Sequence, residues 1–137
     1  MSDWNDWNQT VIEEFRANGG RVGGMFEGSP LLLLHHAGAR TGIRRVSPLM
    51  YQEVPAGYAI FASKGGADNN PDWFHNLVAN PRTEVEVGTE TVPVQARVAF
   101  GEERDRIWTR QKSDYPQFAD YESKTSRVIP VVVLERT

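Results

Sequence analysis

Short links between strand-like segments are the feature that most constrains how this chain folds. Six segments have the apolar or alternating pattern of β-strands, namely 31–36, 45–53, 58–62, 83–87, 91–99 and 128–134. The second and third are separated by a turn at 55–57, and the fourth and fifth by Gly88-Thr89-Glu90. Links this short join antiparallel neighbours, because a parallel crossover needs about a dozen residues or more. The pattern therefore predicts a mainly β fold, a small antiparallel barrel of about six strands.

Three segments have helical patterns. Between Trp4 and Phe15 the apolar residues recur at helical spacing and form a narrow stripe, which predicts an N-terminal amphipathic helix. A second helix is expected to end before Asn80, with Asn70 as its N-cap and Pro71 as its first residue. A third is expected over about 102–112. These helices are peripheral to the predicted strands.

A doubly wound nucleotide-binding sheet is excluded, because regular alternation of strands and helices is absent. Gly23-Gly24 and Gly65-Gly66 also do not form a glycine fingerprint between a strand and a helix. A glycine-rich connector that ends at Gly28 instead divides the chain into two parts. We expect an N-terminal helix with its connector over 1–28 and a barrel domain over 29–137.

The N-terminal helix has two interpretations. Its apolar stripe packs on its own domain, or it docks on a membrane surface or a partner. The longest aliphatic run, 31–34, is far shorter than the ~20 residues of a transmembrane helix. The chain also contains no cysteine, which excludes disulfides and thiolate metal sites. We expect a cytoplasmic protein, with membrane association through the helix as the alternative.

The charge of the chain is unevenly distributed. A net charge of -3 over 137 residues does not fit a generic nucleic-acid-binding protein. Between residues 28 and 67, however, Glu53 is the only acidic residue, and four basic side chains give a local charge of +3. These basic residues are Arg40, Arg44, Arg45 and Lys64.

Two glycine-containing loops carry part of this charge. Arg40 and Thr41 lie in the turn 38–42, and Lys64 precedes the glycine pair 65–66. Such loops expose backbone N–H groups beside a cation and therefore suit a phosphate or a carboxylate. If the second and third strands are neighbours, the loops share one end of the barrel and form one pocket for an anionic ligand. The alternative is that these residues are solvated loop cations.

The second predicted helix offers side chains that suit a planar group. Trp73, Asn76 and Leu77 share one face, so the indole can stack on a ring whose edge the amide hydrogen-bonds. The alternative is that Trp73 is a core residue. No metal site is expected, because His35 and His36 are neighbours on a strand and point to opposite faces.

Three aromatic residues near the C-terminus lie in a loop or a short helix. Tyr115, Phe118 and Tyr121 would form an apolar lid whose phenolic hydroxyls orient a substrate or supply a proton. The alternative is that they close one end of the barrel. A serine hydrolase is not expected, because Ser63 lacks the pattern of a nucleophile elbow.

Several motifs together resemble those of the deazaflavin-dependent nitroreductase and quinone reductase family. The resemblance extends from about Leu31 to the C-terminus, roughly three-quarters of the chain. It is specific because the motifs recur in order, whereas any one of them alone is weak. They are Gly38-Ala39-Arg40-Thr41-Gly42, Arg45-Val46-Ser47-Pro48-Leu49, Ala62-Ser63-Lys64-Gly65-Gly66, Asn70-Pro71-Asp72-Trp73, Asn76-Leu77, Ala79-Asn80-Pro81, Tyr115-Pro116, Tyr121 and Arg127-Val128-Ile129-Pro130-Val131.

The resemblance implies a split β-barrel of the FMN-binding type that binds coenzyme F-420. This cofactor is an 8-hydroxy-5-deazaflavin with a phospholactyl-oligoglutamate tail. The reduced cofactor would transfer a hydride to a small-molecule acceptor, namely a quinone, a nitroaromatic compound, or an activated enone or unsaturated lactone. Two alternatives remain, an FMN-dependent oxidoreductase on the same fold and a non-catalytic deazaflavin-binding carrier.

The resemblance also implies roles for individual residues. Arg40, Thr41, Arg45 and Lys64 would hold the phosphate and the tail carboxylates. Tyr121, with Ser63 or Tyr115, would orient the acceptor or relay the proton that completes the reduction. The cofactor-binding residues that it implies are Ala39, Arg40, Thr41, Arg45, Val46, Ser47, Pro48, Leu49, Met50, Phe61, Ala62, Ser63, Lys64, Asp72, Trp73, Phe74, His75, Asn76 and Phe118.

Three positions depart from the family pattern. Arg40 replaces a lysine, which changes the geometry available for contact with a carboxylate. Met50 and Phe118 stand where members with nitroimidazole activity carry tyrosines, and Phe118 cannot donate a hydrogen bond. This difference argues against reduction of nitroimidazole prodrugs and affects quinones and unsaturated lactones less.

Overall fold

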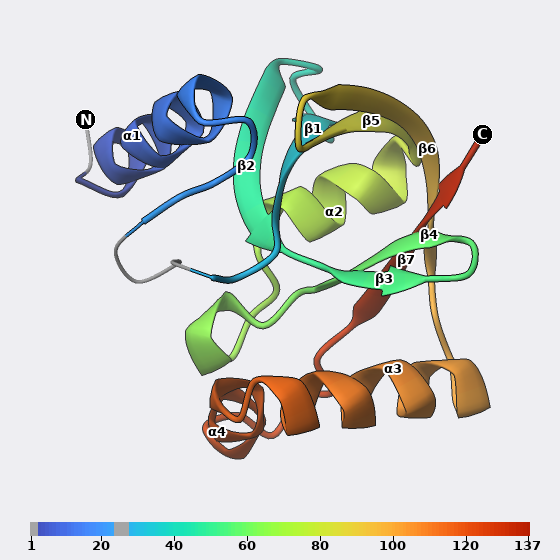
Figure 1. Ribbon diagram of the computed structural model, residues 1–137. Helices are drawn as coiled ribbons and strands as arrows, with labels where there is room; N and C mark the ends of the chain where they lie inside the picture. The colour runs from blue at the N-terminus through green and yellow to red at the C-terminus, as the bar shows by residue number, and fades with distance from the viewer. Residues whose placement is uncertain (1–2, 24–27) are drawn as a thin grey trace.

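The computed structural model shows one curled antiparallel sheet with helices at its outer surface and at one open end (Figure 1). It describes residues 3–23 and 28–137, and side chains from Asn8 onward. Part of the predicted glycine-rich connector and the side chains of Trp4 and Trp7 therefore lie outside the described residues. The predicted mainly β barrel is confirmed.

The described part of the sheet has seven strands rather than about six. They are β1 (Leu31–Ala37), β2 (Arg44–Met50), β3 (Gln52–Val54), β4 (Gly57–Phe61), β5 (Arg82–Val87), β6 (Glu90–Val98) and β7 (Val131–Arg136). The single strand predicted over 45–53 is interrupted at Tyr51, because the chain changes partners there. β2 pairs with β1, whereas β3 pairs with β4.

The order of the strands makes the sheet a split barrel. The order is β2-β1-β5-β6-β7-β4-β3, so the two outermost strands, β2 and β3, follow each other directly in the chain. The sheet must curl for its two edges to meet at the Tyr51 connection, and β2 comes close to β4 without being hydrogen-bonded to it in the described sheet. In the described sheet β2 is an edge strand, so one side of its backbone has no strand partner there.

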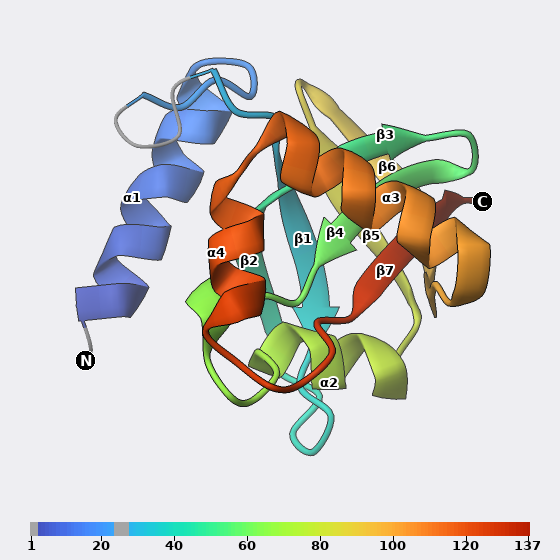
Figure 2. The same cartoon turned by 90° about the horizontal axis from the view of Figure 1, so that it is seen from below.

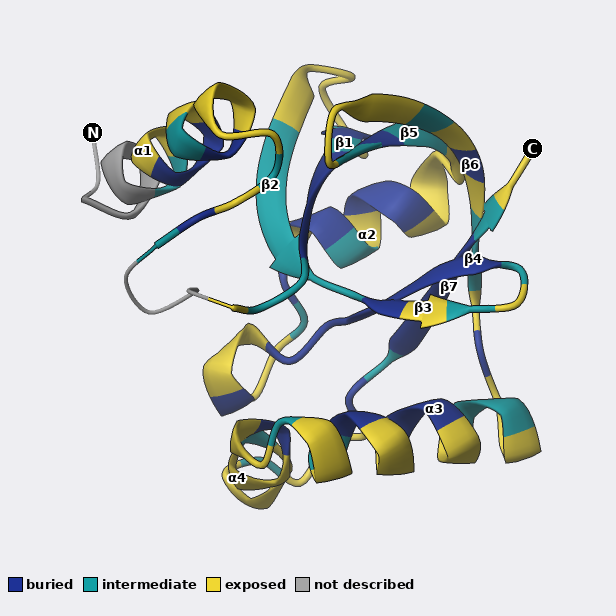
Figure 3. Cartoon of the chain, in the orientation of Figure 1, coloured by how far each residue is buried: buried dark blue, intermediate teal, exposed yellow. Residues whose placement is uncertain are grey.

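The helices cover the sheet from different sides. They are α1 (Asp3–Ala17), α2 (Asp72–Ala79), α3 (Gly101–Asp114), α4 (Gln117–Ser123) and the short 3-10 helix η2 (Lys64–Gly66). Seen from below, α3 and α4 lie across the sheet and α1 lies to one side (Figure 2). In Figure 3 the surface of α3 that faces the sheet is buried and its outward surface is exposed.

The beginning of α2 differs from the prediction. The helix starts at Asp72 with Pro71 as its N-cap residue, one position later than expected. Asn70 is not the cap, because its side-chain oxygen accepts a hydrogen bond of 2.8 Å from Arg127. Trp73 and Leu77 of α2 pack inside the barrel against Leu34, which accounts for the position of the helix.

The described part of α1 packs on its own sheet. Val11, Ile12 and Phe15 are buried against Leu31 and Leu33 of β1. Arg16 also forms a bidentate ion pair with Glu86 of β5, at 3.0 and 2.7 Å. This packing supports the first interpretation of the apolar stripe. No helix among the described residues is long and apolar enough to cross a membrane.

Candidate functional site

The two faces of β2 have different surroundings. The register pairs Ser47 with Leu34, which packs against α2, and pairs Met50 with Leu31, which packs against α1. Because successive side chains alternate between faces, the residues of β2 separate into two sets. Arg45, Ser47 and Leu49 lie on the α2 side, and Val46, Pro48 and Met50 lie on the α1 side.

The three side chains on the α2 side form a gradient of polarity, which we call the β2 strip (Arg45, Ser47 and Leu49). Arg45 is exposed, whereas Ser47 and Leu49 are half-buried. Leu49 packs against the core cluster that contains Trp73 of α2. The strip therefore changes from a cation to a hydroxyl and then to an apolar side chain over one short strand.

The turn between β1 and β2 extends the charged end of this strip; we call residues 38–42 the basic turn. Its backbone is closed by a hydrogen bond of 2.8 Å from the N–H of Gly42 to the carbonyl of Gly38. Arg40 is exposed at its tip. Neither Arg40 nor Arg45 has a carboxylate partner among the described residues, whereas Arg44 lies 3.5 Å from Glu84. Two cations here are thus available to an anionic ligand.

The second cationic loop, residues 62–70, has an unusual backbone. Lys64 has a φ of +47°, and it is the one non-glycine residue of the described chain with a positive φ. Ser63 before it is in the right-handed helical region. A right-handed residue followed by a left-handed one turns successive N–H groups toward one side and makes an anion-binding nest. Strain of this kind points to a binding role.

Arg127 holds this loop, a role that was not predicted from the sequence. Its guanidinium donates to four oxygens of the loop: the carbonyls of Ala62, Ser63 and Ala67 and the side chain of Asn70, at 2.7–3.1 Å. A cation directly before the last strand was the available signal, but its partners lie about 60 residues earlier in the chain.

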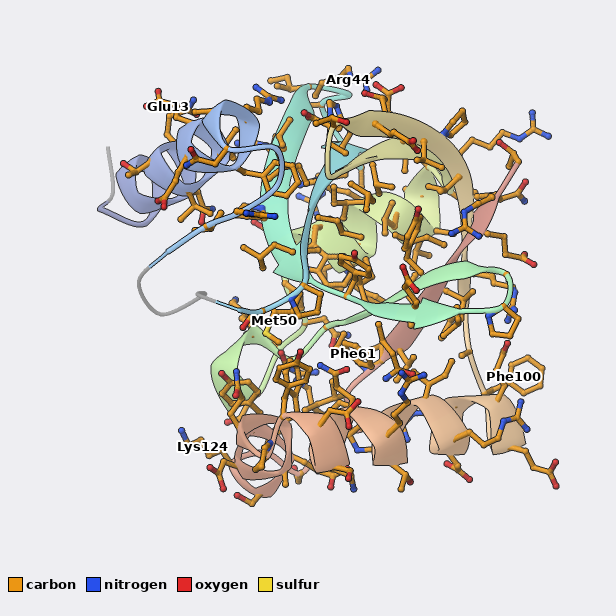
Figure 4. All side chains as sticks on the ribbon, in the orientation of Figure 1. Glu13, Arg44, Met50, Phe61, Phe100 and Lys124 are labelled. Atoms are coloured by element: carbon orange, nitrogen blue, oxygen red, sulfur yellow. The ribbon has the colours of Figure 1, made fainter. Side chains whose placement is uncertain are left out.

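The two cationic loops lie at opposite ends of β2 rather than sharing one end of the barrel. The strand runs from Arg44, beside the basic turn, to Met50, beside η2 and α4 (Figures 1 and 4). Gln117 of α4 approaches the Met50 sulfur at 3.9 Å, in agreement with this view. Cations therefore flank β2 at both of its ends, and the β2 strip extends along the strand between them.

A buried polar chain joins the basic turn to the β2 strip. Asn76 of α2 accepts a hydrogen bond from the N–H of Ala39 and also contacts His36 Nδ1, both at 2.9 Å. His36 Nε2 lies 2.9 Å from Ser47 Oγ. Burial lowers the pKa of His36 to about 4, and the positive charge of Arg45 acts in the same direction. Asn76 is therefore occupied within the protein.

His35 and His36 point to opposite faces, as predicted. His35 Nε2 lies 2.8 Å from the carboxylate of Glu86 on the α1 side, whereas His36 contacts Asn76 on the other. Among the residues that the structure describes, no group of three or more potential ligands could hold a metal ion.

Three aromatic residues proposed to contact the cofactor have their side chains in the core. Trp73 is buried with Leu77 inside the barrel. Phe118 is 5% exposed and packs edge-on against Phe61, with 5.5 Å between the ring centroids. Phe118 also contacts Tyr121 at 5.3 Å. These rings can form the floor of an apolar site but do not stand free in it.

The C-terminal tyrosines occupy different places. Tyr121 is half-buried on α4, and its carbonyl lies so close to Gly66 that a Cβ there would be 2.8 Å from it. This contact brings Tyr121 beside the loop that carries Ser63. Tyr115 caps the C-terminal end of α3, two residues before α4, and lines a hollow of about 290 Å³ with Pro30.

The remaining predicted residues are distributed around α2 and the two loops. Asp72 and His75 are exposed on α2. Phe74 is half-buried and lines an apolar hollow of about 280 Å³ between α2 and β6. Thr41 is exposed and its hydroxyl accepts from the N–H of Ile43 at 3.2 Å. Ala62 is buried, and its carbonyl accepts from Arg127.

The residues present fit F-420 in their charge and order. Exposed Arg40 and Arg45 without carboxylate partners suit the tail, and the nest beside exposed Lys64 suits a further anionic group. The apolar end of β2, at Leu49 and Met50, suits the less polar ring.

A family model described as F-420H(2)-dependent quinone reductase matches residues 7–136. One curated relative, an F-420H(2)-dependent quinone reductase of Mycobacterium tuberculosis, is 40% identical over 126 residues. That alignment covers 89% of this chain and 85% of the relative. A putative F-420H(2)-dependent quinone reductase of the same species is 39% identical over 105 residues, which cover 77% of this chain and 88% of that protein.

Solved structures show the same fold. An F-420-H2 dependent reductase (FDR-A) superposes with a TM-score of 0.71 at 41% identity, covering 77% of this chain and 94% of that one. A chain described as a domain-swapped dimer gives a TM-score of 0.73 at 37% identity, covering 97% and 98%. HutZ, the heme storage protein from Vibrio cholerae, is 15% identical with a TM-score of 0.62, covers 95% and 90%, and shares the fold alone.

Proposed function

The chain belongs to the family of F-420H(2)-dependent quinone reductases, and on that premise we propose that it reduces quinones at the Met50 end of β2. Membership makes it an F-420H(2)-dependent reductase with coenzyme F-420 as cofactor. The acceptor and the roles of individual residues are the proposed part.

The observation that carries the proposal is the polarity gradient of the β2 strip. Arg45 and Arg40 of the basic turn would hold the tail carboxylates, and Ser47 would meet an anionic oxygen nearer the ring. Leu49 would contact the less polar part of the cofactor. The rigid loop that Arg127 organises would present Lys64 and the nest to the phosphate.

Bound in this way, the reduced deazaflavin supplies a hydride, which is two electrons and one proton, to the acceptor. A second proton must reach the other oxygen to convert a quinone into a hydroquinone. Ser63 lies in the loop 62–70 and Tyr121 lies beside it, and both would orient the acceptor through their hydroxyl groups. Tyr115, at the C-terminal end of α3, would act at the entrance rather than at the reacting atoms.

The test is spectrophotometric oxidation of reduced F-420 by the purified protein with a panel of acceptors. We expect turnover with menadione, and we expect the chain to bind F-420 more tightly than FMN. Nitroaromatic compounds and unsaturated lactones in the same panel define the range of acceptors. Tight binding of F-420 without turnover of any acceptor would indicate a carrier and would contradict the proposal.

Two variants test the placement of the anionic groups, Arg40→Ala that of the tail and Lys64→Ala that of the phosphate. Arg40→Ala and Lys64→Ala are each expected to weaken F-420 binding, and the affinity of the unaltered protein should fall with added salt. Arg82→Ala, at an exposed arginine at the start of β5, is a control that should bind normally. If Arg40→Ala binds F-420 as tightly as the unaltered protein, the assignment of the tail is wrong, and if Lys64→Ala does so, the assignment of the phosphate is wrong.

A further inference from the structure

His36 is a buried histidine that the proposed function leaves without a role. It lies on β1 with 5% of its surface exposed, between Ser47 of β2 and Asn76 of α2. Both ring nitrogens are engaged at 2.9 Å. A buried polar group with two specific partners on two other elements is suited to fix the orientation of those partners.

The direction of each hydrogen bond follows from the backbone N–H of Ala39, which can only act as a donor. The N–H of Ala39 is a donor, so the Asn76 atom that it meets must be the carbonyl oxygen, Oδ1. Nδ2 of Asn76 therefore faces His36 and donates to Nδ1. Because Nδ1 accepts, the imidazole is neutral and carries its proton on Nε2.

This tautomer determines what the Ser47 hydroxyl can do. Since His36 Nε2–H donates to Ser47 Oγ, the hydroxyl proton must point to another acceptor. Within residues 3–23 and 28–137, Ser47 has no such acceptor. The serine is half-buried on the β2 strip, between the exposed Arg45 and the apolar Leu49.

We propose that His36 is a positioning residue that fixes Ser47 as a hydrogen-bond donor to an anionic oxygen of F-420, a phosphate or a tail carboxylate. The inference rests on the proposed placement of the cofactor along β2. It assigns His36 no contact with the cofactor and no part in hydride transfer.

The charges around His36 favour the neutral form that this role needs. Burial opposes the protonated form most strongly, and Arg45 on β2 and His35 on β1 oppose it further. Asp72 on α2 acts in the other direction. A protonated ring would place an Nδ1–H against the Asn76 amide N–H, and relief by rotation of the amide would remove the acceptor from Ala39.

The first experiment measures the tautomer directly in the unaltered protein. A two-bond 1H–15N correlation spectrum of labelled protein at neutral pH distinguishes a proton on Nε2 from one on Nδ1. We expect the Nε2–H form for His36. A proton on Nδ1, or on both nitrogens, would overturn the inference whether or not F-420 binds.

The second experiment measures F-420 affinity by cofactor fluorescence in four variants. Ser47→Ala is expected to raise the Kd about tenfold or more, because the variant loses a hydrogen bond to a charged group. His36→Leu should raise the Kd similarly. His36→Gln should restore it to within about threefold, because the amide of glutamine offers an acceptor and a donor at comparable positions. Ser47→Ala combined with His36→Leu should bind within about threefold of Ser47→Ala alone.

The pattern of losses separates this role from a merely structural one. The inference is overturned if the Kd of the double variant rises by the product of the increases for His36→Leu and Ser47→Ala. It is also overturned if Ser47→Ala binds F-420 normally. An unaltered protein that fails to bind F-420 overturns the proposed function, and this inference with it. Binding by the unaltered protein without the expected pattern overturns the inference alone.

Discussion

The two loops that bring cations to the site are held by different chemistry. The basic turn, 38–42, is attached to α2 by one neutral hydrogen bond from Ala39 to Asn76, which belongs to a chain of uncharged groups. The loop at 62–70 is organised around the guanidinium of Arg127, which donates to four oxygens. Hydrogen bonds from a charged donor are stronger, and several of them fix a backbone more firmly than one.

The difference corresponds to what each loop presents. The loop around Lys64 has a strained backbone that only a firm scaffold maintains, since a left-handed lysine is unfavourable. The basic turn places its left-handed residue at Gly42, where no Cβ opposes it, and needs less support. We infer that the loop at 62–70 is prearranged for one anionic group, whereas the basic turn offers cations to a more variable tail.

The largest expected effect comes from removing the charged scaffold. Arg127→Ala leaves four oxygens of the loop without their donor and should lower the free energy of unfolding by about 3 kcal/mol. Urea denaturation measures this change. Arg110→Ala is the control, because among the described residues Arg110 forms an ion pair with Asp114 alone and both side chains are exposed; the replacement should cost less than about 0.5 kcal/mol. Equal losses for the two variants would contradict the comparison.

The uncharged hydrogen-bond network at the basic turn, which includes His36, should make the free energy of unfolding depend on pH. The folded-state pKa of His36 is lowered from 6.5 to about 4, so the unfolded chain takes up the proton first as the pH falls. The contribution of His36 is complete above pH 6.5 and is lost as the pH falls toward 4, a change of about 2–3 kcal/mol.

Urea denaturation at pH 7 and at pH 4.5 gives the change in unfolding free energy for the unaltered protein and for His36→Gln. The difference between these two changes is the contribution of His36, because both proteins have the same carboxylates. The unaltered protein should lose more stability than the variant. An identical pH dependence of the two proteins would show that His36 is not buried in its neutral form.

Asn76→Ala tests whether each loop has its own support. The variant leaves the N–H of Ala39 and Nδ1 of His36 without partners and should cost about 2 kcal/mol. Amide hydrogen exchange should accelerate at Ala39 but remain unchanged at 62–67. Asn80→Ala, at an exposed asparagine beyond the end of the same helix, should neither lower the stability by this amount nor accelerate exchange at Ala39. Faster exchange in both loops would mean that they are one unit.

The smallest predicted effect on stability has an unusual sign. Lys64→Gly relieves the left-handed backbone and should raise the free energy of unfolding by about 0.5–1 kcal/mol, while F-420 binds more weakly. Lys64→Asn separates the effect of backbone strain from the effect of the lost charge, because asparagine tolerates this backbone but carries no charge. It should change stability little and still weaken binding. A destabilised Lys64→Gly protein would argue that the conformation of Lys64 is unstrained.

Local patterns in the sequence predicted most of the elements. The apolar runs of β1 and β7, the hairpin at 88–90 and the amphipathic α1 are each specified by residues close together in the chain, although β7 begins three residues later than predicted, at Val131. The change of partner at Tyr51 could not be predicted, because it depends on where β1 and β4 lie when the barrel forms. A continuous strand and two short strands have the same local pattern.

The candidate site was predictable in its charges but not in its geometry. The excess of basic residues over 28–67 is visible in the sequence. The placement of the two loops at opposite ends of β2, and the burial of Phe118 against Phe61, are properties of the packed barrel. The four partners of Arg127 are likewise determined by contacts between distant segments.

The central claim is that the cations at one end of β2 hold the anionic tail of the cofactor. Its most direct test compares the affinity of F-420 with that of the same deazaflavin without phosphate and tail, using Arg45→Ala and Arg44→Ala. Arg45 has no carboxylate partner in the described chain and faces α2, whereas neighbouring Arg44 faces away and pairs with Glu84. We predict that Arg45→Ala binds F-420 about tenfold more weakly and the tail-less compound normally, with less than a twofold change for Arg44→Ala. Equal losses for both ligands, or for both arginines, would contradict the claim.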